Sequence, residues 1–87
     1  MEFRIDCVVI DSRQTFHRIL AETLSFPEWY GHNLDALYDC LTDIFEPTHL
    51  ILENWDPSSP ALRGFQPVLD DAELENPNLT VTLIPQI

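Results

Sequence analysis

The residues of this chain that are best suited to chemistry are three aspartates at helical spacing. Asp35, Asp39 and Asp43 recur every four positions, so on a helix their carboxylates would lie along one face. Two large aromatic residues, Trp29 and Tyr30, precede them. Carboxylates on a rigid helix can accept strong hydrogen bonds from Arg, Lys and His, the side chains that bind phosphate in the clefts of nucleases. This run therefore indicates a surface that meets a positively charged site.

The same carboxylates could instead belong to an enzyme or a metal site. His32, Asp35 and Asp39 are close in sequence, but neither an EF-hand loop nor an H-E-x-x-H motif is present. Catalytic carboxylate pairs face each other across a cleft, whereas residues four apart on a convex helix project side by side. We therefore expect no enzyme activity, no cofactor and no metal, and keep an enzyme or metal site at these residues as an alternative.

Nucleophilic chemistry has little support. Cys40 lies close to Leu37 and Leu41, where cysteine usually acts as a small buried apolar residue. The two cysteines, Cys7 and Cys40, form no CxxC pair and no cluster with zinc spacing. We expect both to be reduced, as in most cytosolic proteins.

The charge of the chain excludes direct binding to nucleic acid. There are 15 acidic residues against 4 arginines, which gives a formal net charge of −11, and no Lys or Arg lies between Arg18 and Arg63. Binding to phosphates requires basic side chains, whereas an acidic surface attracts a basic protein. Acidity alone could serve solubility, but solubility does not explain several acids on one helix face.

The length of 87 residues predicts a single domain over residues 1–87. No stretch of 18 or more apolar residues is present, so we expect no membrane span. The first residues are charged and lack the pattern of a secretion signal, which favours a cytoplasmic protein. We expect a monomer in the free state.

Hydrophobic periodicity predicts an α/β fold with the order β-α-α-β-α-β and a small parallel sheet. The second helix should run from about Leu34 to Phe45, and Pro67 should kink the third or split it into two. Ser59 and Pro60 would begin that third helix. The first helix should follow a cap at Asp11 or Ser12 and end before Pro27. The predicted strands are 3–10, 49–55 and 79–84.

The two aromatic residues before the acidic helix have different expected roles. One ring should pack at the edge of the core, because large aromatic side chains are usually buried there. The other should stay partly exposed beside the carboxylates, where it could stack on a histidine or arginine of a partner. Trp29 is the better candidate for the exposed position, and Gly31 should give the turn its backbone freedom.

Two stretches resemble the central segment of the barstar family, the intracellular inhibitors of the secreted ribonuclease barnase. They are Pro27-Glu28-Trp29-Tyr30-Gly31 and Asn33-Leu34-Asp35-Ala36-Leu37-Tyr38-Asp39-Cys40-Leu41-Thr42. The flanking pattern is compatible across nearly the whole chain. The resemblance implies a barstar-like fold, a three-stranded parallel sheet with three to four helices packed against it.

The resemblance also implies how the chain would bind. Asp39 would stand where the substrate phosphate sits, Asp35 would meet the guanine-binding loop of the enzyme, and Trp29 would stack on its catalytic histidine. A contact from the last helix would come from Asp71, with Glu73 as the alternative. The partner-binding residues implied in this way are Trp29, Tyr30, Gly31, Asn33, Asp35, Tyr38, Asp39, Thr42, Asp43, Glu46 and Asp71.

Several positions depart from the family pattern. His32 replaces an acid, Asp43 a glycine, and Tyr38 and Ile44 each a tryptophan. Because residues at the rim of an interface often tune specificity, the target could be another ribonuclease or a toxin nuclease domain. We thus expect an inhibitor that forms a 1:1 complex with a basic nuclease. The alternative is an acidic module that binds a basic protein other than a nuclease.

Overall fold

Parallel strands and the helices that connect them make up the chain, as the sequence predicted. The computed structural model describes residues 1–86, so Ile87, the last residue of the expected domain, lies outside the described part. The sheet has the strand order β1-β2-β3, and both pairings are parallel. The elements are β1 (Glu2–Asp6), the 3-10 helix η1 (Cys7–Val9), α1 (Arg13–Leu24), α2 (Leu34–Thr42), β2 (Thr48–Trp55), α3 (Phe65–Glu75) and β3 (Leu79–Pro85).

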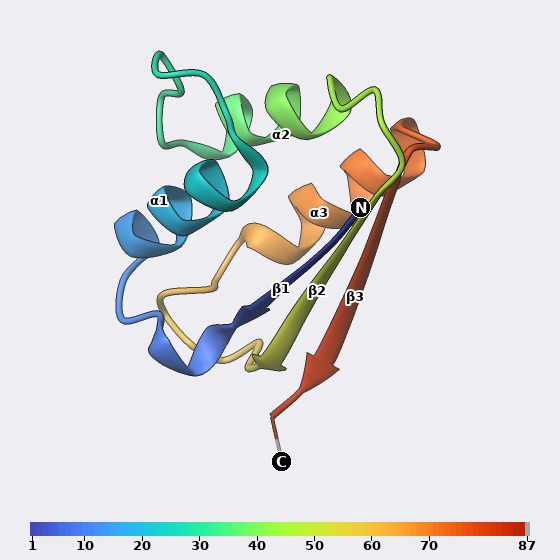
Figure 1. Ribbon diagram of the computed structural model, residues 1–87. Helices are drawn as coiled ribbons and strands as arrows, with labels where there is room; N and C mark the ends of the chain where they lie inside the picture. Colours follow the sequence, from blue (N-terminus) through green and yellow to red (C-terminus); the bar gives the residue numbers. More distant parts are fainter. Residues whose placement is uncertain (87) are drawn as a thin grey trace.

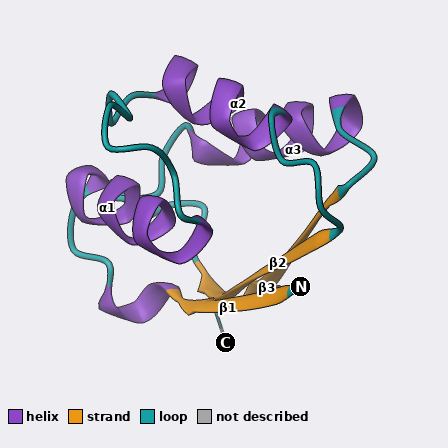
Figure 2. Ribbon diagram, turned by 45° about the horizontal axis from the view of Figure 1, so that its top comes forward, coloured by secondary structure: helices purple, strands orange, loops and turns teal. Residues whose placement is uncertain are grey.

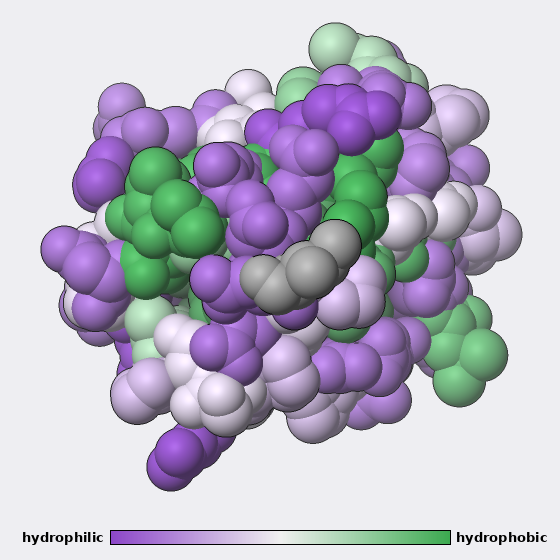
Figure 3. Space-filling model, turned by 90° about the horizontal axis from the view of Figure 1, so that it is seen from below, coloured by the Kyte–Doolittle hydropathy of each residue, from purple (hydrophilic) through white to green (hydrophobic). Residues whose placement is uncertain are grey.

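The molecule has two layers, with the helices packed on one face of the sheet (Figures 1 and 2). Strand residues alternate between this face and the open one, because successive side chains of a strand point to opposite sides. The open face is polar: Arg4 lies 3.5 Å from both Glu2 and Glu53, and His49 Nε2 lies 2.7 Å from Thr82 Oγ1. Figure 3 looks at the end of the molecule where the strands finish, and shows hydrophilic surface interrupted by separate apolar groups.

The hydrophobic core lies between the sheet and the helices. Each helix supplies a pair of apolar residues four positions apart, which is the spacing that places side chains on one face. The central strand β2 supplies two leucines between its neighbours, and each such burial is worth roughly 1.5–3 kcal/mol. The largest fully buried side chains are Phe16, Leu20, Leu37, Leu41, Leu50, Leu52, Phe65 and Leu69.

The first strand is shorter than predicted. It ends at Asp6, whose carboxylate accepts hydrogen bonds from the Val8 backbone N–H and from Asn54 Nδ2, and the chain then turns into η1. Val8 and Val9 are exposed and lie in η1, so the predicted continuation of the strand to residue 10 is wrong. A side chain that caps the backbone outweighed the strand propensity of two valines.

The third helix also differs from its prediction. It begins at Phe65 and not at Pro60, because residues 60–64 form turns and Gly64 adopts a left-handed conformation with φ 86°. Pro67 neither kinks the helix nor splits it. It occupies the third helical position, where a backbone N–H has no partner inside the helix. Because Gly64 is the N-cap of this helix, the expected cap at Ser59 is wrong.

The second helix is shorter than predicted at its carboxyl end. It ends at Thr42 with Asp43 as the C-cap, and not at Phe45. Ile44 is partly buried against the core, but Phe45 is 81% exposed and belongs to the loop that leads into β2. The first helix begins after Ser12, whose hydroxyl accepts a hydrogen bond from the Thr15 N–H, so the predicted cap is confirmed.

Asn76 holds the carboxyl end of α2 in place. This residue is buried at the end of α3, and its amide Nδ2 lies 3.0 Å from the Leu41 carbonyl oxygen and 2.9 Å from that of Ile44. Its side-chain oxygen accepts from the Asn78 N–H and so orders the turn before β3. The carbonyls at the end of a helix have few partners within it, and Asn76 adds a donor to the Leu41 carbonyl in the last turn and to the Ile44 carbonyl just beyond the helix.

Replacing Asn76 should therefore destabilise the fold. We expect Asn76→Ala to lower the free energy of unfolding by about 2–3 kcal/mol, because buried carbonyls lose their donor. Asn76→Asp should cost at least as much, since a carboxylate keeps the shape but cannot donate when ionised. Urea unfolding measures both. The control is Asn78→Ala, which removes an exposed bond to the Phe45 carbonyl and should cost less. Equal losses at the two positions would contradict the role given to Asn76.

Candidate functional site

The acidic face is carried by α2, a helix whose start is fixed by its own sequence. The Asn33 side-chain oxygen accepts a hydrogen bond of 2.8 Å from the Ala36 N–H, which is the usual N-cap arrangement. Leu37 and Leu41 are fully buried on the inner face. The outer face carries Asp35, in the first turn, and the aspartates that follow it.

Asp35, Asp39 and Asp43 are all exposed. Within residues 1–86 none of the three forms an ion pair with a basic side chain. Asp35 interacts favourably with the positive amino end of the helix dipole, but Asp39 and Asp43 lie toward its negative end. The last turn of α2 has no basic residue. The helix therefore ends in negative charge that its own dipole disfavours.

The buried thiol beneath this face is affected by the same charge. Cys40 is 8% exposed, and burial raises the pKa of its thiol, as do the nearby charges of Asp43 and Asp39. Burial likewise raises the pKa of Cys7 to about 11. Both cysteines are free in the structure. Thiols held protonated in this way are poor nucleophiles.

The turn before α2 separates its two aromatic residues. Tyr30 is buried at 5% exposure, its ring packs 5.0 Å from that of Phe26, and its hydroxyl lies 2.6 Å from His17 Nδ1. Trp29 is 75% exposed. The family resemblance implied that both residues contact the partner, but the structure buries the Tyr30 side chain in the core. Tyr30 thus fixes the turn that presents Trp29.

Gly31 has a different reason to be a glycine than the one predicted. The left-handed residue of this turn is His32, with φ 52°, and Gly31 is not among the residues with positive φ. A Cβ on Gly31 would come within 3.0 Å of Asn33 Nδ2, which itself donates to the Gly31 carbonyl. A side chain here would press on the Asn33 amide that caps the helix, so close packing and not backbone freedom favours glycine.

The rim residues differ in how free their polar groups are. The Thr42 hydroxyl donates to the Tyr38 carbonyl oxygen, and both residues are half-buried. Glu46 is exposed in the loop after α2. On α3, Glu73 Oε2 accepts a 2.7 Å bond from the Val81 N–H, whereas Asp71 is exposed. Of the two acids considered for α3, Asp71 is thus the one whose carboxylate is open to solvent.

The alternative metal site gains no support from the geometry. Over residues 1–86, no group of three or more His, Cys, Asp or Glu side chains is placed to hold a metal ion. His32 instead lies beside the buried pair, with its ring 5.1 Å from that of Tyr30 and 6.0 Å from that of His17. Across the same residues, no helix is long and apolar enough to cross a membrane.

Comparison with known protein families agrees with this architecture. The family model described as "Barstar (barnase inhibitor)" matches residues 1–84. The chain belongs to the barstar family.

The chain is similar in sequence to the "Putative ribonuclease inhibitor YrdF" of Bacillus subtilis (strain 168). It is 39% identical over 64 residues, which cover 67% of this chain and 70% of the relative. A second match is to the protein named cytochrome P450 monooxygenase pynD of Aspergillus niger, 43% identical over 56 residues. These cover 60% of this chain but 11% of that protein. Because the match spans so little of the named enzyme, nothing of its activity is assigned to this chain.

Sequence reasoning missed two residues that position the barstar-like site, His17 and Asn76. The sequence held a signal for His17, because this histidine lies between the apolar residues Phe16 and Leu20 of the predicted helix. In the structure it is 2% exposed. A histidine on an apolar stripe needs a polar partner, and Tyr30 was the nearest candidate in sequence that could supply one. For Asn76 the only signal was an asparagine before proline, which predicts a turn but not the contact with α2.

The buried His17–Tyr30 pair should make stability depend on pH. Burial lowers the pKa of His17 below its usual 6.5, and the charges of His32 and Arg13 lower it further. The unfolded chain therefore takes up a proton at a higher pH than the folded chain does, so stability is full above 6.5 and falls as the pH decreases through the folded pKa. We expect the urea midpoint to fall between about pH 7.5 and about pH 5.5.

His17→Gln removes the titrating group and should flatten this dependence, although the variant will be less stable at both pH values. The informative quantity is the difference between the two midpoints of one variant, because the loss of packing cancels in it. An equal pH effect in the parent protein and in His17→Gln would assign the effect to other groups.

Proposed function

We propose that this barstar-family protein inhibits a basic ribonuclease, or a related toxin nuclease, by covering its active site with α2 and the turn before it. The observation that carries the proposal is the row of exposed aspartates without basic partners, which continues to the end of α2 where negative charge is unfavourable. An arrangement that lowers the stability of the free protein is explained if a partner supplies the missing positive charge.

In this mechanism the carboxylate of Asp39 takes the place of the substrate phosphate. A nuclease active site offers Arg, Lys and His donors, and a carboxylate can accept their hydrogen bonds without presenting a bond that can be cleaved. Asp35 would contact the base-binding loop, and Trp29 would stack on a catalytic histidine. The rim would be completed by Gly31, Asn33, Tyr38, Thr42, Asp43, Glu46 and Asp71.

The rigidity of the helix favours tight binding. Asn33 fixes the amino end of α2 and Asn76 fixes its carboxyl end. Between them, Leu37 and Leu41 are fully buried. Little conformational freedom is then lost when the nuclease binds, and more of the interaction energy appears as affinity. The net charge of −11 would also steer a basic partner toward the face and speed association at low salt.

We further propose that the complex is 1:1, that the free protein is a monomer and that it acts in the cytoplasm, where an unwanted nuclease activity would damage the cell's own RNA. Tyr30 contributes in this scheme by holding the turn and not by contact, because its side chain is buried.

Asp39→Ala tests the mechanism directly. Titration of barnase with the parent protein should stop RNA cleavage at one equivalent. The variant should lose several kcal/mol of binding free energy, because removal of the Asp39 carboxylate leaves the basic groups of the nuclease unpaired. Barstar is itself the standard example of this effect, so the magnitude is borrowed from the family. Asp70→Ala, an exposed acid of α3 outside the proposed contact set, is the control with the same change of charge.

Two results would contradict the proposal in different ways. Binding by Asp39→Ala within about threefold of the parent would refute phosphate mimicry, since the loss of a desolvated charge pair costs far more. Binding of the parent to a basic protein without any effect on RNA cleavage would instead favour the alternative, a module for a partner that is not a nuclease.

Asp43→Asn should change stability and affinity in opposite directions. Removing a negative charge at the carboxyl end of α2 should raise the free energy of unfolding by about 0.3–1 kcal/mol. The same change should weaken nuclease binding and lower the association rate. Urea unfolding and stopped-flow binding measure the two effects. If stability rises while affinity is unchanged, Asp43 lies outside the contact surface.

A further inference from the structure

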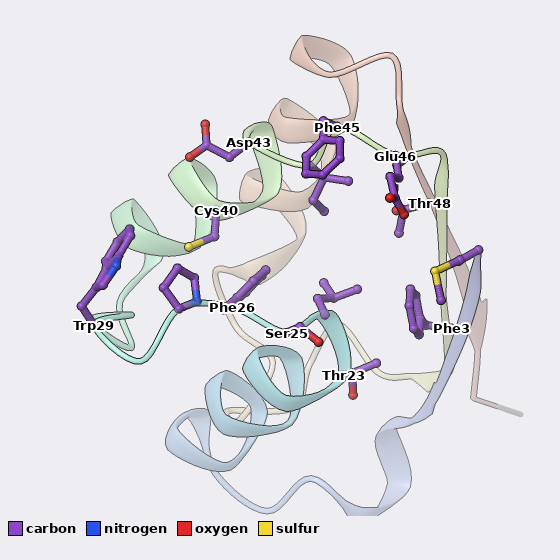
Figure 4. Close-up of a pocket in the computed structure, with 14 residues that line it drawn as sticks. Phe3, Thr23, Ser25, Phe26, Trp29, Cys40, Asp43, Phe45, Glu46 and Thr48 are labelled. Carbon is purple, nitrogen blue, oxygen red and sulfur yellow. Dashed lines mark hydrogen bonds between the residues drawn. The ribbon is translucent and has the colours of Figure 1, made fainter.

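A groove opens beside the acidic face, and much of its wall comes from residues that the proposed mechanism does not use. It has a volume of about 540 Å³ and lies between the end of α1, the loop before α2, the loop after α2 and the start of β1. In Figure 4, Trp29 lies at one end of the groove and Phe3, Glu46 and Thr48 lie at the other, with Phe26 and Cys40 near the Trp29 end. Such a volume falls within the range of roughly 300–1,000 Å³ found for ligand sites.

The lining of the groove is apolar with acidic groups at its margin. Phe3, Leu24, Phe26 and Ile44 contribute apolar surface, and the lining contains no Lys, Arg or His. Its one positive group is the N-terminal ammonium of Met1, which donates to the Pro47 carbonyl oxygen. Its two carboxylates, Asp43 and Glu46, make no ion pair with a basic side chain in residues 1–86. An occupant that satisfies this lining is apolar at its centre and basic at its edge.

The groove is also continuous with the proposed nuclease-binding face. Trp29, Asp43 and Glu46 belong both to the groove and to that face. Trp29 is 75% and Phe45 81% exposed, so each places a large ring in water at the margin of the groove. Aromatic side chains of this kind are common anchors of protein interfaces, because they bury much area and lose little conformational freedom.

We propose that the groove receives an apolar side chain from a surface loop of the inhibited nuclease, with basic residues beside it that pair with Asp43 and Glu46. This inference rests on the proposed function and extends it: the acidic helix binds the catalytic groups, and the groove binds a loop outside the active site. Charge complementarity and continuity with the acidic face select a loop of the same basic partner as the occupant.

The experiment blocks the groove from a wall that carries none of the proposed contact residues. Thr23 lies in the last part of α1 and lines the groove, and Thr23→Phe would fill it with a ring at little cost in helix propensity. Phe45→Ser removes an exposed ring from its other side. The probe is barnase, and the readouts are RNA cleavage and the dissociation rate of the complex.

Matched controls place the same changes elsewhere. Gln14→Phe adds a ring to an exposed position in the first turn of α1, and Val9→Ser removes an exposed apolar side chain from η1. We expect Thr23→Phe and Phe45→Ser each to weaken binding by about tenfold or more, mainly through faster dissociation, and the controls to stay within about twofold. Urea unfolding of each variant confirms that it is folded.

The outcomes separate this inference from the function on which it rests. If Asp39→Ala abolishes inhibition while both groove variants bind like the parent protein, the groove proposal is wrong and the acidic mechanism stands. If the parent protein binds neither barnase nor another basic ribonuclease or toxin nuclease, both proposals fall. If the free protein sediments as a dimer that Phe45→Ser dissociates, a second copy of the chain occupies the groove and the nuclease loop is excluded.

Discussion

The hydrogen bonds from the Asn76 amide to the carboxyl end of α2 are the interaction on which the rest of the site depends. They join the end of α3 to carbonyls that a helix cannot satisfy by itself, and they do so across 35 positions of sequence to Leu41. The same side chain orders the turn into β3 through Asn78. One residue therefore sets the position of the acidic helix relative to the sheet, and the placement of Asp39 and Asp43 follows from it.

The amino end of the helix depends on a second constraint, the buried contact between His17 and Tyr30. This pair holds the loop against α1, so that Trp29 is left facing water while its neighbour is packed inside. Gly31 then lets the Asn33 cap approach closely. Trp29 and Asp35 are thus positioned at the amino end of α2, and Asp39 and Asp43 toward its carboxyl end, so the surface is formed before any partner binds. Preformed surfaces bind tightly because little is lost on ordering.

Sequence reasoning succeeded where a local rule was strong. The parallel sheet followed from three apolar runs separated by helical patterns, and the start of α2 followed from the leucine-rich stretch that begins at Leu34. It failed where a distant contact decided the outcome. Asp6 ended β1 because it caps η1 and is held by Asn54, a residue 48 positions away. The helix ends before Phe45, and not at it as predicted, because Asn76 donates to the Leu41 and Ile44 carbonyls. The Tyr30 side chain likewise points inward to meet His17, 13 positions earlier in the chain. Rules that consider only nearby residues do not predict this contact.

The acidic helix also shows how stability and binding compete within one element. A helix selected for stability alone would carry Lys or Arg in its last turn, whereas this one carries Asp39 and Asp43 there. Charge by itself, however, attracts any basic protein, so it gives fast association and weak discrimination. Discrimination needs shape as well, and we propose that the apolar groove beside the charged face supplies it. A basic partner without a matching loop would leave the groove unfilled and Trp29 and Phe45 in water. In the mechanism that we propose, the carboxylates determine which class of protein binds, and the groove determines which member of that class binds tightly.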